Sequence, residues 1–502
     1  MAQSLDRWPV LVGVGECVQR GKDLSVAKEP VDLMVDAVRA AAADAGWSDV
    51  SALDRLDVIQ QFSWPVHDAP GEVAKALGAQ PTWRRYGPVG GETPVAFIHE
   101  AALAIARGDS QVAVVVGGES QYSVNAAQAS GVTLPWRQRD DETPLLRGAV
   151  YQHEMAKRLG VAIPATISPL FENAALAALG LTPAQAHAES ADLWSRFSQV
   201  AAGNPVAWSQ QAFSPEEVAE PSLQNRRVAW PYTKRMVANP AVNQAAAVLL
   251  TSRQQALAWG VAPERLVYVH TGAAADDPKN VLERDDLAVS HGRDAVLDTM
   301  REHIGEVSSL SALELYSCFP VVPKLARRRL GLAAQYPMTV TGGLSFFGAP
   351  LNNYMGHAAV AMVRDLRAAA PGAKGLLYGQ GGNMTKHHAL LLGREPGSVE
   401  ALHAPVSVQA QADAARAAPP NLNMAHQGAA SVETFTVMFA RNGEPGQGVV
   451  VLRNAARERL LARVEADDAH SLSVLMDSTR SPVGHPGQVH TRIDGTPIWQ
   501  AH

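Results

Sequence analysis

The residues best suited to nucleophilic or proton-transfer chemistry lie in the second half of the chain. Cys318 stands in the segment Tyr316-Ser317-Cys318-Phe319, which follows an apolar run typical of a buried strand. A cysteine in such a place could be a base or a nucleophile, or it could be a small buried side chain at a strand end. Cys17 is the only other cysteine. Two cysteines without a Cys-x-x-Cys pair indicate neither a disulfide framework nor a zinc site.

Histidines provide the second set of candidates. His357 lies in an alanine-rich helical segment, where a core position competes with a role as catalytic base. His387 and His388 follow a glycine-rich loop, and a loop histidine could serve as a general base near pH 7 or could be solvated at the surface.

A glycine-rich loop early in the chain, "GPVGGETP", runs into the helical segment "TPVAFIHEAALAIARG". Such junctions present nucleophiles or bind anions through backbone amides. This loop contains no cysteine, serine or lysine, so it keeps only the amides. The unit of loop, helix, turn, strand and Gly-Gly returns at residues 341–382. The repetition predicts two similar α/β halves, each of which offers a helix N-terminus to a shared cleft.

Short apolar runs alternate with alanine-rich segments of helical period, which predicts a layered α/β architecture. With 502 residues, the chain should form two or three domains. The expected buried strands are "PVLVGVG", "LDVIQQF", "QVAVVVGG", "AAAVLLTS", "RLVYVHTG", "ALELYSCF" and "GLLYGQGG".

Four domain segments are predicted. Residues 1–120 and 241–275 form an N-terminal half and residues 276–400 a C-terminal half. Residues 121–240, with amphipathic helices and Pro- and Trp-bearing connections, form an insertion that covers the cleft. Residues 401–502 are predicted to form a small β-barrel, which begins with a hairpin in "SVETFTVMFARNGEPGQGVVVLRN" and continues with β structure in "SLSVLMDSTR" and "GTPIWQAH".

Composition limits the classes of partner. A formal net charge of -6 argues against a general nucleic-acid binder, which would need a basic face. The N-terminus lacks the pattern of a signal peptide, and no apolar run approaches the roughly 18 residues of a membrane span. We therefore expect a soluble cytoplasmic protein without nucleic-acid or membrane partners.

The motifs occur in a characteristic order: "VGVGE", "GGETPVAFIHEAA", "VVVGGES", "LELYSCF", "GGLSFFGAPLNNY" and "GQGGNMTKH". This order resembles the thiolase superfamily, in particular the sterol-carrier-protein-type thiolases, over residues 5–395. The β-rich tail and the "GGNMTKH" loop resemble the thiolase-like proteins type 1, which carry an additional OB-like C-terminal domain. The resemblance implies a thiolase fold and coenzyme A (CoA) esters of lipid metabolism as ligands or substrates, with no metal or redox cofactor.

The catalytic positions of thiolases are only partly kept. The resemblance places Gly91 where thiolases have the nucleophilic cysteine, and Ala349 where the Gly-His-Pro motif has its histidine. Tyr378 or Gly379 stands at the cysteine of the Cys-x-Gly motif. Losing a covalent nucleophile costs on the order of a million-fold in kcat, and losing an oxyanion donor about a hundred- to a thousand-fold. The usual thiolase mechanism is therefore not expected.

One catalytic element survives. Thiolases of the sterol-carrier type have a His-Asp-Cys-Phe motif with an acid/base cysteine, and Cys318 keeps that cysteine while Tyr316 replaces the histidine. Tyr354 could donate a hydrogen bond to a thioester oxygen, or it could pack.

The resemblance also suggests groups that bind CoA. Glycines in two loops would allow a pantetheine chain or thioester to approach the backbone closely, although turns explain them equally well. Basic residues in the insertion and after the second loop could contact phosphates. The candidate binding residues are Gly91, Lys234, Arg235, Gly342, Gly343, Gly381, Gly382 and Lys386.

Three functions remain open. The first is an acyl-CoA-binding, thiolase-like acyltransferase, nominally an acetyl-CoA acetyltransferase, in which Cys318 carries the sulfur chemistry with His387 or His357. The second is a retro-aldol lyase acting on a β-hydroxyacyl-CoA, which needs no acyl-enzyme. The third is a CoA-ester-binding protein without catalysis. A homodimer and a monomer are both compatible with the sequence.

Overall fold

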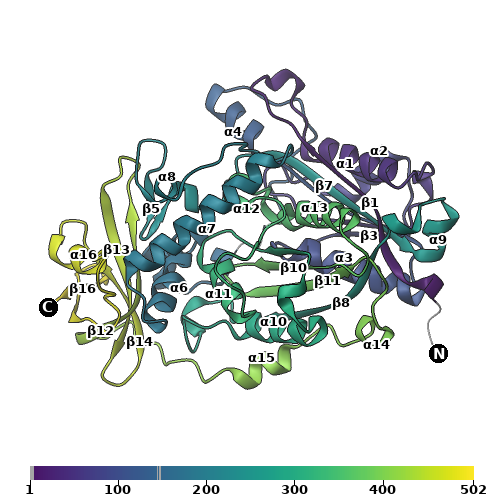
Figure 1. Cartoon of the computed structure of the whole chain (residues 1–502). Coiled ribbons are helices and arrows are strands. Elements are labelled where there is room, and N and C mark those ends of the chain that lie inside the picture. Colours follow the sequence, from purple (N-terminus) through teal and green to yellow (C-terminus); the bar gives the residue numbers. More distant parts are fainter. Residues whose placement is uncertain (1–4, 144, 146–147) are drawn as a thin grey trace.

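The computed structural model describes residues 5–143, 145 and 148–502, and its largest element is a nine-stranded sheet in the order β3-β2-β4-β7-β1-β8-β11-β10-β9 (Figure 1). The strands that form this sheet are β1 (Pro9–Val18), β2 (Arg55–Val58), β3 (Trp83–Tyr86), β4 (Val112–Ser120), β7 (Asn243–Ser252), β8 (Val267–Asp276), β9 (Ala312–Leu315), β10 (Lys374–Gly381) and β11 (Lys386–Gly393).

The sheet consists of two halves with the same strand order. We number the strands of each half by their order in the sequence. In the N-terminal half the strands then lie side by side in the order third, second, fourth, fifth, first, which corresponds to β3-β2-β4-β7-β1. The C-terminal half has the order second, fourth, fifth, first, which corresponds to β9-β10-β11-β8. Within residues 267–393, all of which are described, no strand takes the third place. A short antiparallel pairing between β1 and β8 joins the halves. The expected duplication is thus confirmed, with one strand missing.

Five layers follow from the packing of the helices. Helices α1 (Pro30–Asp44) and α2 (Ala69–Leu77) cover the outer face of the N-terminal half, and α10 (His291–Ile304) and α11 (Val321–Arg329) cover that of the C-terminal half. Helices α3 (Thr93–Arg107) and α13 (Tyr354–Ala368) lie between the halves, because each contacts strands of both and the two helices contact each other. One continuous hydrophobic core includes all of these elements.

The central helix α3 begins and ends as its sequence dictates. Pro94 stands in the first turn, where its missing N–H leaves no bond unmade, and Gly108 ends the helix in the left-handed conformation. Eight of the nine alanine, valine, isoleucine and phenylalanine side chains of α3 are buried. The helix is therefore apolar on nearly all sides, which fits its place between the two halves of the sheet.

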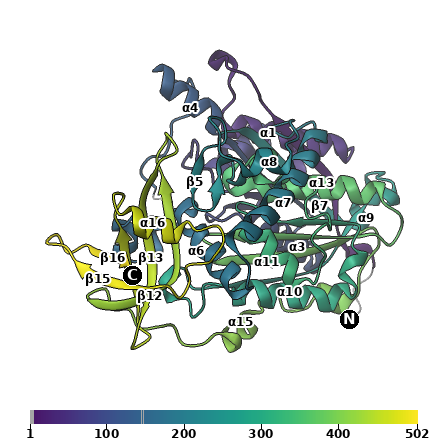
Figure 2. The same cartoon turned by 60° about the vertical axis from the view of Figure 1, so that its left-hand side comes forward.

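The inserted region, residues 121–240, contains helices and one short hairpin. Its elements are α4 (Gln121–Ser130), α5 (Glu154–Arg158), α6 (Pro164–Ala178), α7 (Pro183–Gly203), α8 (Pro215–Ala219), β5 (Arg227–Ala229) and β6 (Tyr232–Thr233). Helix α6 contacts α11 on one side and the C-terminal barrel on the other (Figure 2). Helix α7 lies against the glycine turn at Gly342 and Gly343.

The C-terminal region forms a closed five-stranded barrel at one end of the molecule (Figure 1). Its strands are β12 (Gly428–Phe439), β13 (Pro445–Asn454), β14 (Arg459–Val464), β15 (Pro486–Thr491) and β16 (Pro497–Ala501), and the ring closes in the order β12-β13-β14-β16-β15-β12. The predicted hairpin corresponds to β12 and β13. The predicted β structure in "SLSVLMDSTR" is wrong, because residues 469–475 form helix α16, which Asp468 caps through the Ser471 amide.

A buried arginine joins the barrel to the α/β body. The Arg459 side chain is fully buried and donates to the carbonyls of Leu282 and Arg284, at 2.7 and 2.5 Å, and to the Glu433 carboxylate. At another place on the barrel, strand β5 of the insertion extends it through the pairing of Ala229 with Met438. The barrel is therefore tied to both the body and the insertion.

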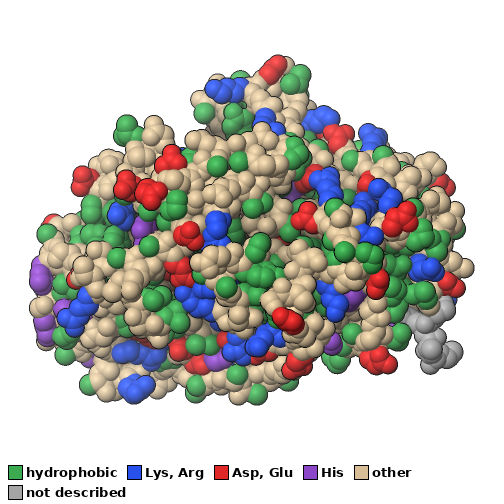
Figure 3. Space-filling model, viewed as in Figure 1, with side chains coloured by type: hydrophobic (Ala, Val, Ile, Leu, Met, Phe, Trp, Pro, Cys, Tyr) green, Lys and Arg blue, Asp and Glu red, His purple; other side chains and the backbone are tan. Residues whose placement is uncertain are grey.

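None of the described helices is long and apolar enough to cross a membrane. Acidic and basic side chains are interspersed on the face seen in Figure 3, as the modest net charge would suggest.

The Arg459 contact predicts a large difference between two neighbouring arginines. Arg459→Ala removes a buried cation from two carbonyls and a carboxylate, and should lower the free energy of unfolding by about 3 kcal/mol. Arg453→Ala removes a half-buried partner of the same Glu433 carboxylate and should cost less than about 1 kcal/mol. Urea unfolding followed by circular dichroism measures both values. Equal losses would contradict the linking role of Arg459.

Candidate functional site

The two glycine loops meet where the N-termini of the central helices face each other. The Gly90 amide donates a 3.0 Å hydrogen bond to Asn352 Oδ1, and Asn352 Nδ2 donates to the Gln60 carbonyl at 2.8 Å. Asn352 lies two residues before the start of α13, and Gly90 lies three residues before the start of α3. The amide ends of both helices thus point toward one region, which is where thiolase chemistry is expected.

The space above Gly91 is already filled. A β-carbon placed on Gly91 would lie 2.4 Å from Tyr316 Oη, 2.6 Å from Tyr316 Cζ and 2.6 Å from the Gln380 carbonyl oxygen. Tyr316 is buried just beyond the end of β9 and its ring meets the ring of Tyr354 edge-on, with 5.9 Å between centroids. A cysteine at position 91 could not be accommodated without moving Tyr316. The tyrosine hydroxyl therefore takes the place of the missing nucleophile.

Cys318 lies two residues beyond Tyr316, and its thiol is not activated. The Sγ atom is 3.7 Å from Gln380 Oε1. Burial raises the pKa of the Cys318 thiol to about 12, and hydrogen bonds from nearby backbone amides offset this only in part. At neutral pH Cys318 is a thiol, which can give a proton but is a weak nucleophile.

Glu92, which the sequence analysis did not single out, is a buried carboxylate beside Gly91. Its Oε2 contacts the backbones of Gly90 and Gly381, where added β-carbons would lie only 2.3 and 1.7 Å from it. Among the described residues, none hydrogen-bonds to Oε2. Burial raises the pKa of this carboxyl above its ordinary value, while Lys386 Nζ, 3.5 Å from Oε1, opposes the rise. Its position directly after Gly91 is the signal that could have identified it.

Several predicted binding residues make protein contacts instead of facing an open site. Lys386 Nζ donates to the Val89 carbonyl at 2.8 Å. Gly381 makes room for Glu92, whereas Gly382 has a positive φ and lies against Thr385. Their roles toward CoA phosphates or pantetheine stay predictions.

The glycines and cations near the insertion are similarly engaged. Gly342 and Gly343 both have positive φ, and added β-carbons would meet Ala201 and Phe197 of helix α7 at 2.4 and 2.5 Å. The Arg235 guanidinium lies 4.2 Å from the centroid of the Phe213 ring. Lys234 is exposed on the same short turn. Contact of either cation with CoA stays a prediction.

Tyr354 belongs to a separate polar network just behind Tyr316. Its hydroxyl bonds to Glu314 Oε1 and to Thr341 Oγ1, both at 2.6 Å. The Glu314 carboxyl is fully buried and also accepts from Thr339 Oγ1 and the Val340 amide, at 3.0 and 2.8 Å. Burial raises its pKa to about 7, although these hydrogen bonds favour the charged form. Tyr354 therefore positions Tyr316 through ring contact, while its own hydroxyl is engaged elsewhere.

The candidate histidines lie in other networks. His357 Nδ1 is 2.8 Å from Glu16 Oε2, and Arg364 holds the other oxygen of that carboxylate. His387 is fully buried, with Nδ1 2.8 Å from Tyr378 Oη and Nε2 3.2 Å from Asp277 Oδ2. These contacts orient His357 and His387 inside the protein, and none of them involves Cys318 or Tyr316.

His388 forms a buried pair with His99 of helix α3. Its Nε2 lies 3.0 Å from His99 Nδ1, and neither ring has room for solvent. Burial lowers the pKa of His99 to about 4 and lowers the pKa of His388 well below its ordinary value. The two rings are therefore neutral at physiological pH and join α3 to β11.

The structure thus brings together Gly91, Tyr316, Cys318, Gly381 and Lys386 from the predicted set, and adds Glu92 and Gln380. It separates His357 and His387 from this group by giving each its own partners, and Tyr354 meets the group only through its ring contact with Tyr316. Within the described part of the chain, no cluster of three or more histidine, cysteine, aspartate or glutamate side chains could hold a metal ion.

Comparison with known proteins gives results for the tail and for the whole chain. Residues 407–496 match the family model "Thiolase-like protein type 1 additional C-terminal domain". The whole chain is similar to a monomeric SCP2-thiolase-like protein type 1 from Mycobacterium smegmatis, with a TM-score of 0.82, 27% identity and 99% of each chain covered. These findings support the thiolase superfamily for this chain. The chain carries the additional C-terminal domain of the type 1 thiolase-like proteins.

Two ordinary thiolases share the fold at lower identity. The dimeric peroxisomal thiolase of Saccharomyces cerevisiae aligns with a TM-score of 0.57 and 13% identity, over 78% of this chain and 98% of that chain. An acetyl-CoA acetyltransferase from Syntrophomonas wolfei aligns with a TM-score of 0.55 and 16% identity, over 77% and 99%. The search of curated proteins gives no match. These alignments confirm the predicted thiolase fold of the body.

Restoring the thiolase nucleophile should destabilise the protein. Gly91→Cys forces its Cβ into the Tyr316 hydroxyl and should lower the free energy of unfolding by about 1–3 kcal/mol, as overpacking does. In the double variant with Tyr316→Ala, the added loss at position 91 should largely disappear. Urea unfolding of the four proteins of this double-mutant cycle gives the coupling energy. Strictly additive losses would show that Tyr316 does not limit position 91.

Both cysteines should be slow to react in the folded protein. Burial raises the pKa of Cys17 and of Cys318 to about 12. At pH 8 the thiolate fraction of each should be on the order of 1,000-fold below that of a free cysteine. Ellman's reagent should therefore detect neither thiol quickly until denaturant is added. Rapid reaction of one thiol, lost in Cys318→Ala but kept in Cys17→Ala, would identify Cys318 as activated.

Glu314 should make stability depend on pH in a specific direction. Because its folded pKa of about 7 exceeds the ordinary value of 4.5, the folded state holds this proton more tightly than the unfolded state. The resulting stabilisation is complete below about pH 4.5 and is lost as pH rises through 7. The stability of the wild type should therefore fall relative to Glu314→Gln between these values. Chemical denaturation of both proteins from pH 4.5 to 8 measures this difference, and parallel curves would refute the assignment.

Proposed function

We propose that this protein binds CoA thioesters at the meeting point of the two helix N-termini and does not carry an acyl group on residue 91. The observation that supports this most directly is the Tyr316 hydroxyl, which fills the volume above Gly91 that a nucleophilic side chain would need. The fold shared with an acetyl-CoA acetyltransferase and a peroxisomal thiolase supports the CoA-ester class of ligand.

The groups around Gly91 suit a thioester carbonyl. The junction of loop and helix α3 offers backbone amides at the positive end of the helix dipole. Burial raises the pKa of the Tyr316 phenol well above its ordinary value, so its hydroxyl remains a hydrogen-bond donor at neutral pH. The protonated Cys318 is a second donor nearby. A site rich in donors stabilises a carbonyl oxygen without forming a covalent bond.

Acyl transfer would have to proceed through Cys318, and its surroundings oppose this. A nucleophilic cysteine requires a cation, a base or a helix N-terminus to lower its pKa. Cys318 Sγ lies 3.7 Å from the Gln380 side-chain oxygen, which does not stabilise a thiolate, and the nearby backbone amides offset the effect of burial on its pKa only in part. We therefore favour non-covalent binding over the acetyltransferase reaction, and no contact in this group specifically favours the lyase.

The test combines intact-protein mass spectrometry and thermal unfolding in the presence of acetyl-CoA and acetoacetyl-CoA. Binding should raise Tm with ligand concentration, and no covalent acyl increment should appear. Tyr316→Phe keeps the ring but loses the hydrogen-bond donor. The variant should therefore need about 5- to 10-fold more thioester for the same rise in Tm. Cys17→Ala is the control, because Cys17 lies elsewhere, bonded to the Leu33 carbonyl.

Two results would overturn the proposal. An acyl increment that disappears in Cys318→Ala would establish Cys318 as a relocated nucleophile and restore the acyltransferase assignment. A Tm that does not respond to either thioester at millimolar concentration would exclude binding of this ligand class.

A further inference from the structure

A second site lies at the seam between the insertion and the C-terminal barrel, away from the residues around Gly91. A groove of about 590 Å³ is formed there by the loop that precedes β5, by β5 itself and by the turn between β12 and β13. Its lining contains the arginines Arg226, Arg227 and Arg441 and the aromatic residues Trp230 and Phe439. This volume is typical of sites for small molecules.

The charged side chains that line the groove are all basic. The described residues that line it include these three arginines and no aspartate or glutamate. Nor do Arg226, Arg227 and Arg441 form an ion pair with any described residue, whereas most arginines of the body do. Toward the described residues, the Arg226 guanidinium makes one hydrogen bond, of 2.9 Å, to the Arg227 carbonyl. The groove therefore holds positive charge that the protein itself does not neutralise, and an anion would supply the missing partner.

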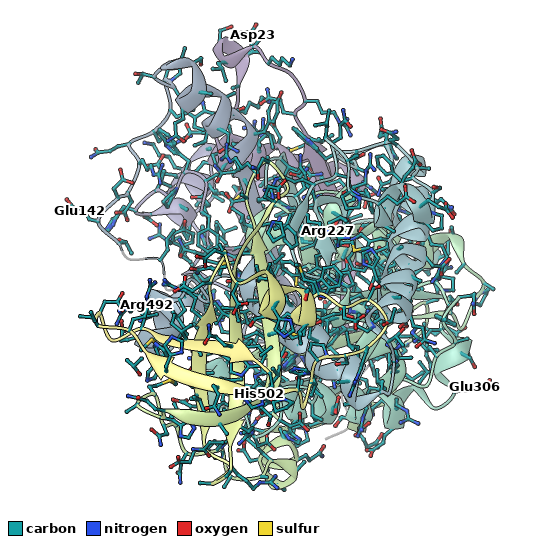
Figure 4. The ribbon with its side chains drawn as sticks, turned by 90° about the vertical axis from the view of Figure 1, so that its left-hand side faces the viewer. Asp23, Glu142, Arg227, Glu306, Arg492 and His502 are labelled. Carbon is teal, nitrogen blue, oxygen red and sulfur yellow. The ribbon has the colours of Figure 1, made fainter. Side chains whose placement is uncertain are left out.

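The aromatic residues add a flat stacking surface to this charge. The Arg227 guanidinium lies 4.8 Å from the centroid of the Trp230 ring and 6.0 Å from that of Phe439. Figure 4, in which the barrel side of the molecule faces the viewer, shows Arg227 beside the barrel strands. The Trp230 indole N–H is buried and has no acceptor among the described residues. Stacked guanidinium and aromatic planes are the surfaces on which nucleic-acid bases bind.

The groove is held in shape by buried hydrogen bonds. Asn225 is fully buried, and its Nδ2 donates to the carbonyls of Glu217, Val218 and Glu220 at 3.1, 3.0 and 2.9 Å. This fixes the loop that carries Arg226 and Arg227. Across the seam, the Trp230 amide donates to the Val437 carbonyl at 2.9 Å. The site is thus formed before any ligand binds, which limits the entropy lost on binding.

We infer that this groove binds the phosphorylated end of a nucleotide, with the base stacked on the aromatic and guanidinium planes and the phosphates held by the arginines. The source of the nucleotide is either a free nucleotide or the nucleotide end of CoA. The second source rests on the proposed function. The CoA source is favoured by the β5–β6 hairpin, since the ring of Tyr232 of β6 packs at a tilt against Phe319, the neighbour of Cys318, with 5.5 Å between ring centroids. One hairpin thus borders the groove and the thioester site.

The experiment is isothermal titration of the full chain with ADP, adenosine 3′,5′-bisphosphate and CoA. Adenosine alone and inorganic phosphate alone represent the two halves of the ligand. Arg227→Ala and Arg441→Ala should each weaken nucleotide binding about ten-fold or more. The control is Arg480→Ala, because Arg480 lines a different cavity of about 590 Å³ that also contains Asp286 and Glu433. Arg441 is exposed, so its substitution should leave Tm unchanged even if Arg227→Ala destabilises the fold.

The pattern of affinities separates the two sources and the two proposals. CoA binding tighter than ADP, with both weakened in the groove variants, supports the CoA source, whereas equal affinities support a free nucleotide. Unchanged nucleotide affinity in Arg227→Ala and Arg441→Ala, or no nucleotide binding at millimolar concentration, would overturn the proposal that the groove binds nucleotides. So would tight binding of a thymidine oligonucleotide that mononucleotides do not displace, because that would indicate a single-strand site. If the thioesters raise Tm but the groove variants leave nucleotide affinity unchanged, the nucleotide-site proposal is wrong and the proposed function still holds. If nucleotides bind in the groove but the thioesters do not raise Tm, the proposed function is wrong and the nucleotide site still holds.

Discussion

The contact between Gly91 and Tyr316 constrains the whole site. The two halves of the nine-stranded sheet pack on two central helices, and the loops before those helices must approach closely for the Gly90–Asn352 hydrogen bond to form. Tyr316 comes from the C-terminal half and fills the space beside a residue of the N-terminal half that has no side chain. Any larger residue at position 91 would push the halves apart or displace the tyrosine. Packing and chemistry are therefore decided by the same few atoms.

Around this contact, most ionisable residues of the body are committed to pairs. His357 is held by Glu16, His387 by Tyr378 and Asp277, and His388 by His99. Such buried networks specify a unique arrangement of the elements they join, and breaking one partner is costly. Glu92 Oε2 has no hydrogen-bond partner among the described residues, and Arg226, Arg227 and Arg441 of the groove form no ion pair with them. Polar and charged groups without a protein partner are the groups that a ligand could contact.

Much of the architecture could be predicted from the sequence because strands buried on both faces and alanine-rich helices have distinct periodicities. The central helices, the duplication and the first barrel hairpin all follow from local pattern. Helix α16 was missed, because "SLSVLM" has the apolar content of a short strand, and only the Asp468 cap distinguishes it. The absent third strand of the C-terminal half could not be seen either, since a missing element leaves no pattern to read.

The site was predictable only in part, for a related reason. The motif order placed Gly91, Tyr316 and Cys318 near one another, but no spacing rule shows that one side chain occupies the volume of another. Glu92 was passed over because a glutamate in the first turn of a helix is ordinary on sequence alone. The partners of His357 and His387 lie 341 and 110 residues away along the chain, so only the tertiary structure could assign them.

The shortened C-terminal half has a consequence for association. Because that half lacks its third strand, the sheet ends at β9, and its other edge is β3; each has only four residues. An edge strand of this length exposes few free amides and carbonyls, so it is a poor template for a strand from another molecule. Closure of the barrel leaves its five strands paired on both sides. Growth of this protein by edge-to-edge strand addition is therefore disfavoured by its topology, whatever its surface charge.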